Sequence, residues 1–565
     1  MADANRANKG SPELRWGSGT YRSWTHKFGT LFAMTAGSAN ATQFPMMVIA
    51  YGGVPFLLAC FAFLLFVAFP VMRLESNLAQ FVGDGNRGIF STVPLFFGIG
   101  YALTAYVLSH VVADTMALAD ALALLMSLTK SFDWHHDCPG GWMTRNFSCY
   151  AIRPGSAPCK LARDDLTDTF RHDTSSEGIP VSSGNKVILI PSEQYKDEAT
   201  GCIPDLPDTG APYHFRRQTI WEPGAIDSFW AEPVFAIAVI WLLVFAITHK
   251  GFLKLKAVFY AIVLLHIVTT LMLLARASTL NGASWGLRLF FHANWSSLTS
   301  LEMWSNALYV SLESVGVTGT MYLGIERFNC FKNKFQEDVI FVLVADTASK
   351  GIGTFTSFLF LGHLSYATGI NIHMLVHKDF NFIVSISHQT VSLVPFPEFW
   401  SRVHSLWLVS MMLPKFLIVP DIIIEVLSVS HPPMVVNRRS THFFICLVLF
   451  SLSIPAVIPG GAKGVSVLCS SQNNFRLFLL ALELIVFLQL YGARRLEVDS
   501  QLMTGGTPGF FVKLCWTSII PLALMVLLSA KAFRPITVER QHPVFLTALM
   551  AWVQMVEFSF IPVYA

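Results

Sequence analysis

The sequence has few charged residues. Lys, Arg, Asp and Glu together make up 13% of the 565 residues, the formal net charge is +3, and 53% of the residues are hydrophobic. Soluble domains carry about twice that share of charged residues, so the composition excludes a soluble multidomain protein. The basic residues form no long run, which excludes the basic surface of a nucleic-acid-binding protein. The composition instead predicts a protein that lies in a lipid bilayer.

The N-terminal segment lacks the features of a secretory signal peptide. It is basic, but it contains no short apolar core followed by small residues at a cleavage site. We therefore expect residues 1–27 to form a cytoplasmic tail. Basic residues in alternate predicted loops favour an orientation with both the N- and C-termini in the cytoplasm, and the expected location is the plasma membrane.

Long apolar runs recur along the chain. A helix that crosses a bilayer needs about 20 mainly apolar residues. Unbroken apolar runs also exclude the alternating pattern of a membrane barrel, so we expect an all-α polytopic membrane protein. The twelve predicted transmembrane helices lie at 28–50, 54–80, 96–128, 229–247, 255–278, 303–325, 338–368, 403–428, 440–458, 474–492, 512–530 and 543–564.

One long polar segment interrupts this series. Residues 129–228 separate helices 1–3 (28–128) from helices 4–12 (229–565), and the predicted orientation makes the segment a large extracellular loop. An oxidising compartment favours disulfides.

Four cysteines lie in this loop and allow three connectivities, with Cys138 and Cys149 as the nearest pair. The Asn-X-Ser motifs at Asn146 and Asn294, both in predicted outer loops, are candidate glycosylation sites.

Short motifs spread over nearly the whole chain occur in the order seen in one known family. They include Trp24, Phe44-Pro45, Tyr51-Gly52-Gly53, Pro70 with Glu75, Cys138-Pro139-Gly140-Gly141-Trp142, Leu490-Tyr491-Gly492 and Lys513-Leu514-Cys515-Trp516. On these motifs the chain resembles the sodium:neurotransmitter symporter family. The resemblance implies a transporter rather than an enzyme. It also implies a five-plus-five inverted repeat, with helices 1 and 6 broken where solute and sodium bind at mid-membrane.

The two implied breaks contain the candidate solute-binding residues, which are Ser38, Asn40, Ser311 and Glu313. Asn40 matches the family's ion-binding asparagine, and Asp346 replaces a second one. The resemblance therefore implies at most one remaining sodium site, formed by Asn40, Asp346 and neighbouring backbone.

Other family site residues are replaced. Helix 8 carries Met412-Leu413-Pro414 where relatives carry Leu-Asp-Ser, and a leucine offers no oxygen to a hard cation, so a second sodium site is not expected. Cys60, Ala307 and Lys350 stand where relatives place chloride-binding Tyr, Gln and Ser, so chloride binding is not expected either.

Both gates of the family are altered as well. Gln43 takes the place of the outer-gate arginine, while Tyr21 and Ser428 take the places of the inner-gate arginine and aspartate. No gate salt bridge is expected from these residues.

Three charged residues stand where the family has mostly neutral ones. Glu313 lies at the break of helix 6, while Asp346 and Lys350 lie four apart on one face of helix 7. Isolated charges at mid-bilayer cost several kcal/mol, so these groups are expected to pair inside the protein. One hypothesis makes Lys350 a tethered cation that pairs with Asp346 or Glu313 and replaces a bound ion. The other makes the group a structural salt bridge without a role in transport.

The leading interpretation is a secondary transporter that moves a small amino-acid-like or amine solute by alternating access. No aspartate occurs between Trp24 and Pro45, which disfavours the amine. The alternative is a transport-inactive family member that acts as a partner or regulatory membrane protein. The expected partners are the solute and the bilayer, and a homo-oligomer stays open.

Overall fold

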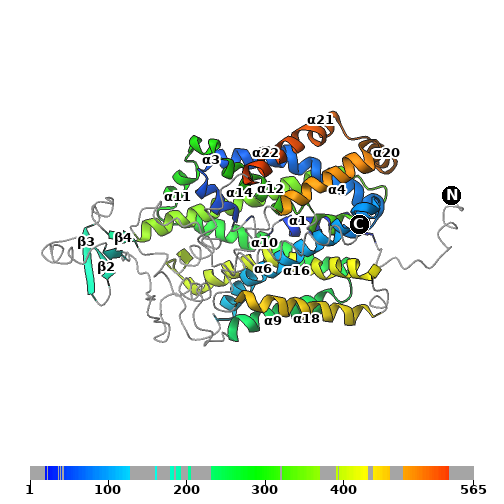
Figure 1. Ribbon diagram of the computed structural model, residues 1–565. Helices are drawn as coiled ribbons and strands as arrows, with labels where there is room; N and C mark the ends of the chain where they lie inside the picture. The colour runs from blue at the N-terminus through cyan, green and yellow to red at the C-terminus, as the bar shows by residue number, and fades with distance from the viewer. Residues whose placement is uncertain are drawn as a thin grey trace.

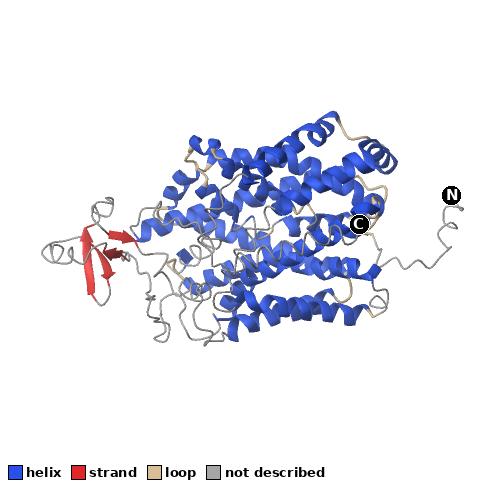
Figure 2. Ribbon diagram, in the orientation of Figure 1, coloured by secondary structure: helices blue, strands red, loops and turns tan. Residues whose placement is uncertain are grey.

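The structure is a computed structural model that describes part of the chain. The described residues are 20–21, 23–35, 37, 40, 43–127, 231–318, 321–368, 390–391, 393–430, 437–457 and 475–532, with short strands between 159 and 204. Helices dominate and most run side by side along one direction (Figure 1 and Figure 2). The strands lie beyond one end of this bundle.

The first apolar run forms two helices rather than one. α1 (Trp24–Thr35) ends before the non-helical Gly37, and Asn40 and Gln43 are π-helical ahead of α2 (Phe44–Ala50). The chain then turns at Gly53, whose φ is 71°. A Cβ atom at Gly53 would lie 2.3 Å from the backbone oxygen of His292, so only glycine fits this turn.

The next helices carry the chain across the bundle and back. The first of them is long and apolar from Val54 to Val82, with a π-helical turn in its middle. The elements are α3 (Val54–Phe63), η2 (Leu64–Ala68), α4 (Phe69–Val82), α5 (Asn86–Phe90), η3 (Pro94–Phe96), α6 (Gly98–Ser127), α9 (Ala231–Thr248), η8 (Phe252–Lys254), α10 (Lys256–Ser278), α11 (Ala283–Phe290) and η9 (Trp295–Thr299).

A second helix is also interrupted. α12 (Leu301–Val315) ends at Gly316, which has the left-handed conformation that favours glycine at a helix C-terminus, and α13 (Met321–Glu326) follows. Thr318 has a φ of 60°, which a β-branched residue rarely adopts. Its backbone N–H donates to the buried carboxylate of Glu75, which therefore helps to hold the interruption.

The remaining helices complete the bundle. They are α14 (Phe335–Thr368), α16 (Pro397–Ser430), α18 (Arg438–Val457), η10 (Ile485–Gly492), α20 (Ala493–Thr504), α21 (Phe510–Leu514), η11 (Cys515–Ile519) and α22 (Ile520–Ala532). The helix that contains η10 and α20 begins at Phe475.

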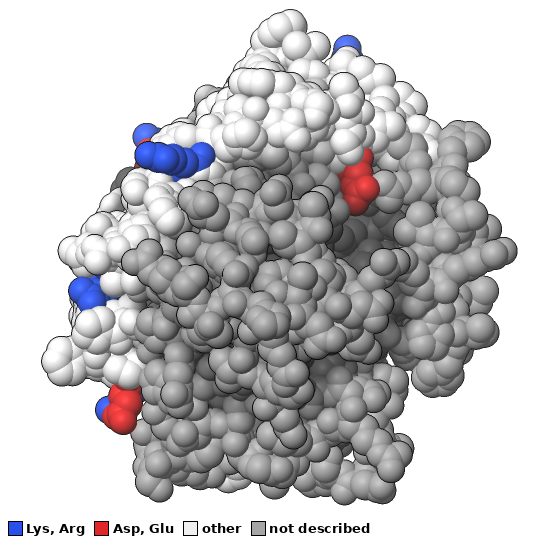
Figure 3. Space-filling view, turned by 90° about the vertical axis from the view of Figure 1, so that its left-hand side faces the viewer, with Lys and Arg blue, Asp and Glu red and all other residues white. Residues whose placement is uncertain are grey.

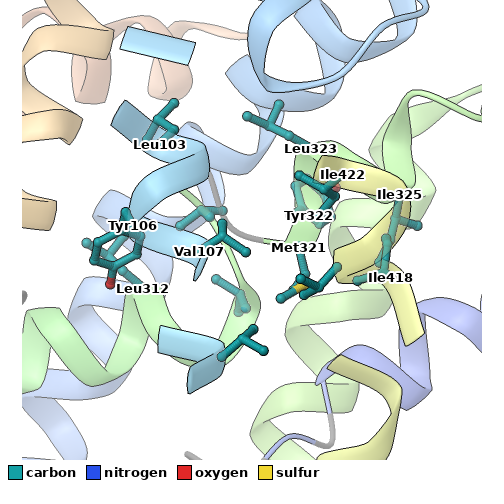
Figure 4. Packing of buried hydrophobic residues seen from close by; sticks show 14 of the residues in the cluster. Leu103, Tyr106, Val107, Leu312, Met321, Tyr322, Leu323, Ile325, Ile418 and Ile422 are labelled. Carbon is teal, nitrogen blue, oxygen red and sulfur yellow. The ribbon is translucent and has the colours of Figure 1, made fainter. Parts of the chain in front are cut away.

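A large apolar core lies between α6, α13 and α16. These helices pack against one another through buried side chains, while many apolar side chains on the outer helices are exposed. Figure 4 shows Leu103, Tyr106 and Val107 of α6 across from Met321, Tyr322 and Ile325 of α13 and from Ile418 and Ile422 of α16. Apolar surface on the outside is what a bilayer solvates.

Among the described residues, eight helices are long and apolar enough to cross a membrane. The interrupted helices fall below that length, α9 contributes a shorter apolar stretch from Val234 to Thr248, and the predicted span 543–564 lies outside the described residues. A helical, multi-pass architecture is therefore confirmed. The count of twelve and the inverted repeat stay predictions.

The polar segment corrects one detail of the expected fold. It contains two antiparallel strand pairs, β1 (Cys159–Leu161) with β4 (Cys202–Pro204) and β2 (Gly178–Ser183) with β3 (Lys186–Pro191). The chain is thus all-α only in its apolar part, because runs rich in β-branched residues such as that of β3 favour strands. Cys138, Cys149 and Asn146 lie outside the described residues. Figure 3 views the molecule from this end, where the described surface carries few charged side chains, some of them acidic and basic side by side.

Candidate solute and ion site

The first interrupted helix contacts α14 through Asn40 and Asp346. The Asn40 amide donates to Asp346 Oδ1 at 2.9 Å and to the backbone oxygen of Thr35 at 2.7 Å. Both side chains are fully buried. Two residues that are 306 positions apart in the sequence are therefore joined at the point where α1 ends.

Lys350 completes this cluster. Its Nζ lies 2.7 Å from Asp346 Oδ2 and 2.5 Å from Ser314 Oγ, and it lies 5.4 Å from the ring centre of Phe44. Ser314 also donates to Asp346 Oδ2, at 3.2 Å. Of the two partners expected for Lys350, the structure places Asp346 beside it. The buried carboxylate thus has a positive partner and two neutral donors.

The residues around Asn40 do not fit a sodium ion while Lys350 holds this position. A hard cation prefers oxygen ligands. Both Asp346 oxygens already accept hydrogen bonds, and Lys350 balances the charge of the carboxylate. In the described part of this cluster, Asn40 Oδ1 is the buried side-chain oxygen left without a partner. The arrangement accommodates one positive charge at Asp346, and the lysine supplies it.

Glu313 belongs to a second cluster. Its carboxylate lies 3.4 Å from Lys415 Nζ and accepts a hydrogen bond from Arg476, and Lys415 lies 2.5 Å from Asp114 Oδ2. Of the two alternatives for Lys350, Asp346 is therefore the partner in the structure, and Glu313 faces two other cations. This cluster joins α6, α12, α16 and the helix that begins at Phe475.

Arg476 is fully buried in this second cluster. One nitrogen, Nη2, donates to the backbone oxygens of Leu312 and Val317, and Nη1 lies 3.3 Å from the hydroxyl of Tyr106. The interruption after Val315 frees backbone oxygens that would otherwise bond within the helix. The guanidinium group of Arg476 donates hydrogen bonds to two such oxygens.

A cavity opens between the two interruptions. It encloses an empty volume of about 700 Å³, its open mouth included. Its charged lining residues are Asp114, Glu313 and Lys415, and Asn40 lines it as well. The other walls are mainly apolar, from Leu31, Met34, Val315, Met321, Tyr322, Ile325, Val342, Met411, Met412 and Phe416. Apolar walls with a few charged or polar groups are typical of a small-molecule site.

Of the predicted solute-binding residues, some line the cavity and one instead forms a hydrogen bond within its own helix. Asn40 and Glu313 line the cavity. The Ser311 hydroxyl instead donates within its own helix, to the backbone oxygen of Ala307 at 2.7 Å, and Ser311 is not part of the lining. Ser38 lies outside the described residues.

The three positions that the resemblance matched to chloride ligands, Cys60, Ala307 and Lys350, lie close to one another. The Cys60 thiol lies 3.9 Å from the backbone oxygen of Ala307, and the Ser311 hydroxyl lies 3.2 Å from the backbone oxygen of Cys60. Lys350 joins Asp346 beside them. Neither Cys60 nor Ala307 brings a side-chain nitrogen or hydroxyl to this region.

Two buried salt bridges near the predicted inner gate were not anticipated from the sequence. Lys27 of α1 pairs with Asp338 of α14, and Arg327, just after α13, pairs with Glu425 of α16. Glu425 also accepts the backbone N–H of Gly85 at 2.7 Å. Two ion pairs therefore lie near the region where the resemblance implied no gate salt bridge from Tyr21 and Ser428.

Asp114, Lys415 and Arg476 were also missed by the sequence reasoning. Each interrupts a long apolar run, and a charge inside a membrane span is by default a candidate functional residue. That signal was sufficient to select them. The pairing of Lys415 with Asp114 and of Arg476 with Glu313 was not predictable from spacing, because the partners lie on different helices.

Comparisons with known proteins agree with this architecture. The family model described as sodium:neurotransmitter symporter family matches residues 22–174 and 214–565. The chain is 23% identical over 94% of its length to the sodium- and chloride-dependent glycine transporter 2 of Xenopus laevis, covering 67% of that protein. It is 22% identical to the sodium- and chloride-dependent GABA transporter ine of Drosophila melanogaster, covering 50% of it. It is 24% identical to the sodium- and chloride-dependent neutral and basic amino acid transporter B(0+) of Mus musculus, covering 78% of it.

Proposed function

Because this chain belongs to the sodium:neurotransmitter symporter family, we propose that it is a secondary transporter of a small amino-acid-like or amine solute. The cavity between the two interrupted helices supports this proposal. It is apolar on most sides, carries a few charged groups, and lies where half-helices expose backbone groups to a ligand. Alternating access would open this cavity to each side of the plasma membrane in turn, with both termini in the cytoplasm.

The ion requirement of the proposed transporter differs from that of its relatives, whose names describe them as sodium- and chloride-dependent. Lys350 serves as a tethered cation at Asp346, so sodium is not needed to balance this carboxylate. The observation that carries the proposal is the 2.7 Å contact between Lys350 Nζ and Asp346 Oδ2 in a fully buried setting. Chloride independence is part of the same proposal, because the carboxylate of Asp346 supplies the negative charge that balances Lys350, and no bound anion is needed for this.

Uptake into cells that display the protein at their surface tests this function. Labelled amino acids and amines are offered in sodium chloride, in choline chloride and in sodium gluconate. We expect uptake in all three media and its loss in Lys350→Ser. Lys513→Ser is the matched control, because Lys513 forms a more exposed ion pair with Glu497 at 2.8 Å. Uptake that requires sodium in the unaltered protein would refute the tethered cation, although transport itself would stand.

A transport-inactive partner protein is the second candidate function. The ion pairs among Asp114, Glu313, Lys415 and Arg476 favour it, because they link helices on several sides of the cavity and resist their separation. Absence of uptake for every solute, with surface expression equal to that of an active relative, would support this candidate and contradict the transporter.

A further inference from the structure

The charged residues at the cavity form a balanced set. Asp114 and Glu313 are acidic, Lys415 lies between them, and Arg476 approaches Glu313 from outside the lining. Two negative and two positive groups therefore add to zero. A cavity of this kind has no surplus charge to offer a solute.

The members of this set differ in their access to the cavity. Arg476 has a fully buried side chain, and it is bound by two backbone oxygens as well as by Glu313. The side chains of Lys415 and Asp114 retain 19% and 15% of their exposure, and both line the cavity. The Asp114–Lys415 pair is thus the most accessible part of the set, while Glu313, which also lines the cavity, retains 9% of its exposure.

Charge balance limits which solute can enter. A cationic amine would add one uncompensated positive charge to a poorly hydrated site, and a carboxylate anion would add one negative charge. A zwitterion adds none. Its ammonium group can take the place of Lys415 beside Asp114 while its carboxylate takes the place of Asp114 beside Lys415, so that two ion pairs replace one.

We propose that Asp114 and Lys415 are the specificity-determining residues of this cavity, and that they select zwitterionic amino acids over the corresponding amines and acids. Asp114 binds the ammonium group and Lys415 binds the carboxylate. The apolar walls from Met34, Met321 and Phe416 then receive the side chain of the solute. The inference rests on the proposed function in one respect, namely that the cavity is a solute site. It requires that the cavity bind the solute but not that the protein transport it.

A matched ligand series tests the selection directly. Purified full-length protein is heated in detergent with leucine, with 3-methylbutylamine, which lacks only the carboxylate, and with 4-methylpentanoate, which lacks only the amine. Glycine, methylamine and acetate form a second series for the case of a narrow cavity. We expect one or both amino acids to raise the melting temperature and to bind about 30-fold or more tightly than their amine and acid counterparts, as the loss of one partner of a desolvated ion pair predicts.

Single substitutions then assign each group. Lys415→Met should weaken binding of the amino acid by about 30-fold or more and make the amine the better ligand, since Asp114 is left without its cation. Asp114→Asn should favour the acid instead. Arg402→Met is the control on the same helix, because the Arg402–Glu398 pair is exposed at 3.5 Å, and it should leave the ligand order unchanged.

The outcomes separate this inference from the transport proposal. Binding of an amino acid without any uptake would refute transport and leave the specificity pair standing. Uptake accompanied by equal binding of amine and amino acid, or by an unchanged ligand order in Lys415→Met, would overturn the pair and leave transport standing. If no member of either series stabilises the unaltered protein, the inference is wrong, and this result does not depend on whether the variants fold.

Discussion

Replacing Lys350 by methionine removes the ammonium group while keeping a side chain of similar length. Asp346 then remains as a fully buried carboxylate with only Asn40 and Ser314 as donors. At an effective dielectric constant of about 20, two unit charges at the observed separation attract by about 6 kcal/mol. Because desolvation offsets part of this attraction, we expect the loss of one partner to destabilise the protein by about 3–5 kcal/mol.

The second substitution, Asp346→Asn, provides the matched comparison. In the double variant Lys350→Met with Asp346→Asn, both charges are gone, and the amide that replaces the buried carboxylate can still bond to Asn40. A buried ion pair replaced as a pair costs little, so the double variant should be more stable than Lys350→Met alone. The order of stability of the variants is measured by thermal unfolding of the purified proteins in sodium-free buffer, with all variants at one concentration.

Adding sodium provides a second comparison between Lys350→Met and the unaltered protein. In Lys350→Met, Asp346 and the unpartnered Asn40 Oδ1 form an oxygen site with an unbalanced negative charge. Sodium at ten times its dissociation constant should restore about 1.4 kcal/mol of stability to this variant and none to the unaltered protein. The reasoning is refuted if Lys350→Met is as stable as the unaltered protein in sodium-free buffer, or if sodium stabilises both equally.

Two further predictions concern the turn after α2 and the loop before α12. Gly53→Ala should destabilise the protein more than Gly83→Ala, as measured by thermal unfolding. Both glycines have a positive φ, but only a Cβ atom at Gly53 would clash with backbone, at 2.3 Å. Equal destabilisation by the two substitutions would show that the clash is relieved. Asn294 is exposed, and its Oδ1 accepts a hydrogen bond from Ser296 Oγ at 2.7 Å, so Asn294→Gln should remove one glycosidase-sensitive shift on a gel, and an unchanged pattern would contradict the predicted outer location of this loop.

Much of the helical framework was predictable from the sequence, because length and apolar composition determine which segments can cross a bilayer. The interruption near Asn40 was predicted by the family resemblance and is visible as the gap between α1 and α2. The i, i+4 spacing of Asp346 and Lys350 also predicted their pairing correctly, since that geometry is local to one helix.

Contacts between helices were beyond the reach of sequence spacing. Glu313 was one of two alternative partners considered for Lys350, yet it pairs with Lys415 and Arg476. Which charged groups meet depends on the rotation and crossing of α12 and α16, and apolar periodicity does not specify these for helices that are apolar on most faces. The strands between 159 and 204 were missed for another reason, because a polar segment was expected to be loop throughout.

The position of Arg476 has a mechanical consequence. Its guanidinium group bonds to Leu312 and Glu313 within α12, to Val317 within the interruption, and to Tyr106 on α6. Shearing these helices past one another would break several buried bonds at once and leave a charge unpaired in a dry interior. The helix that begins at Phe475, α12 and α6 are therefore joined into one rigid body. Within the described part of the chain α1 contributes no bond to Arg476 and is instead joined to α14 by the Lys27–Asp338 ion pair.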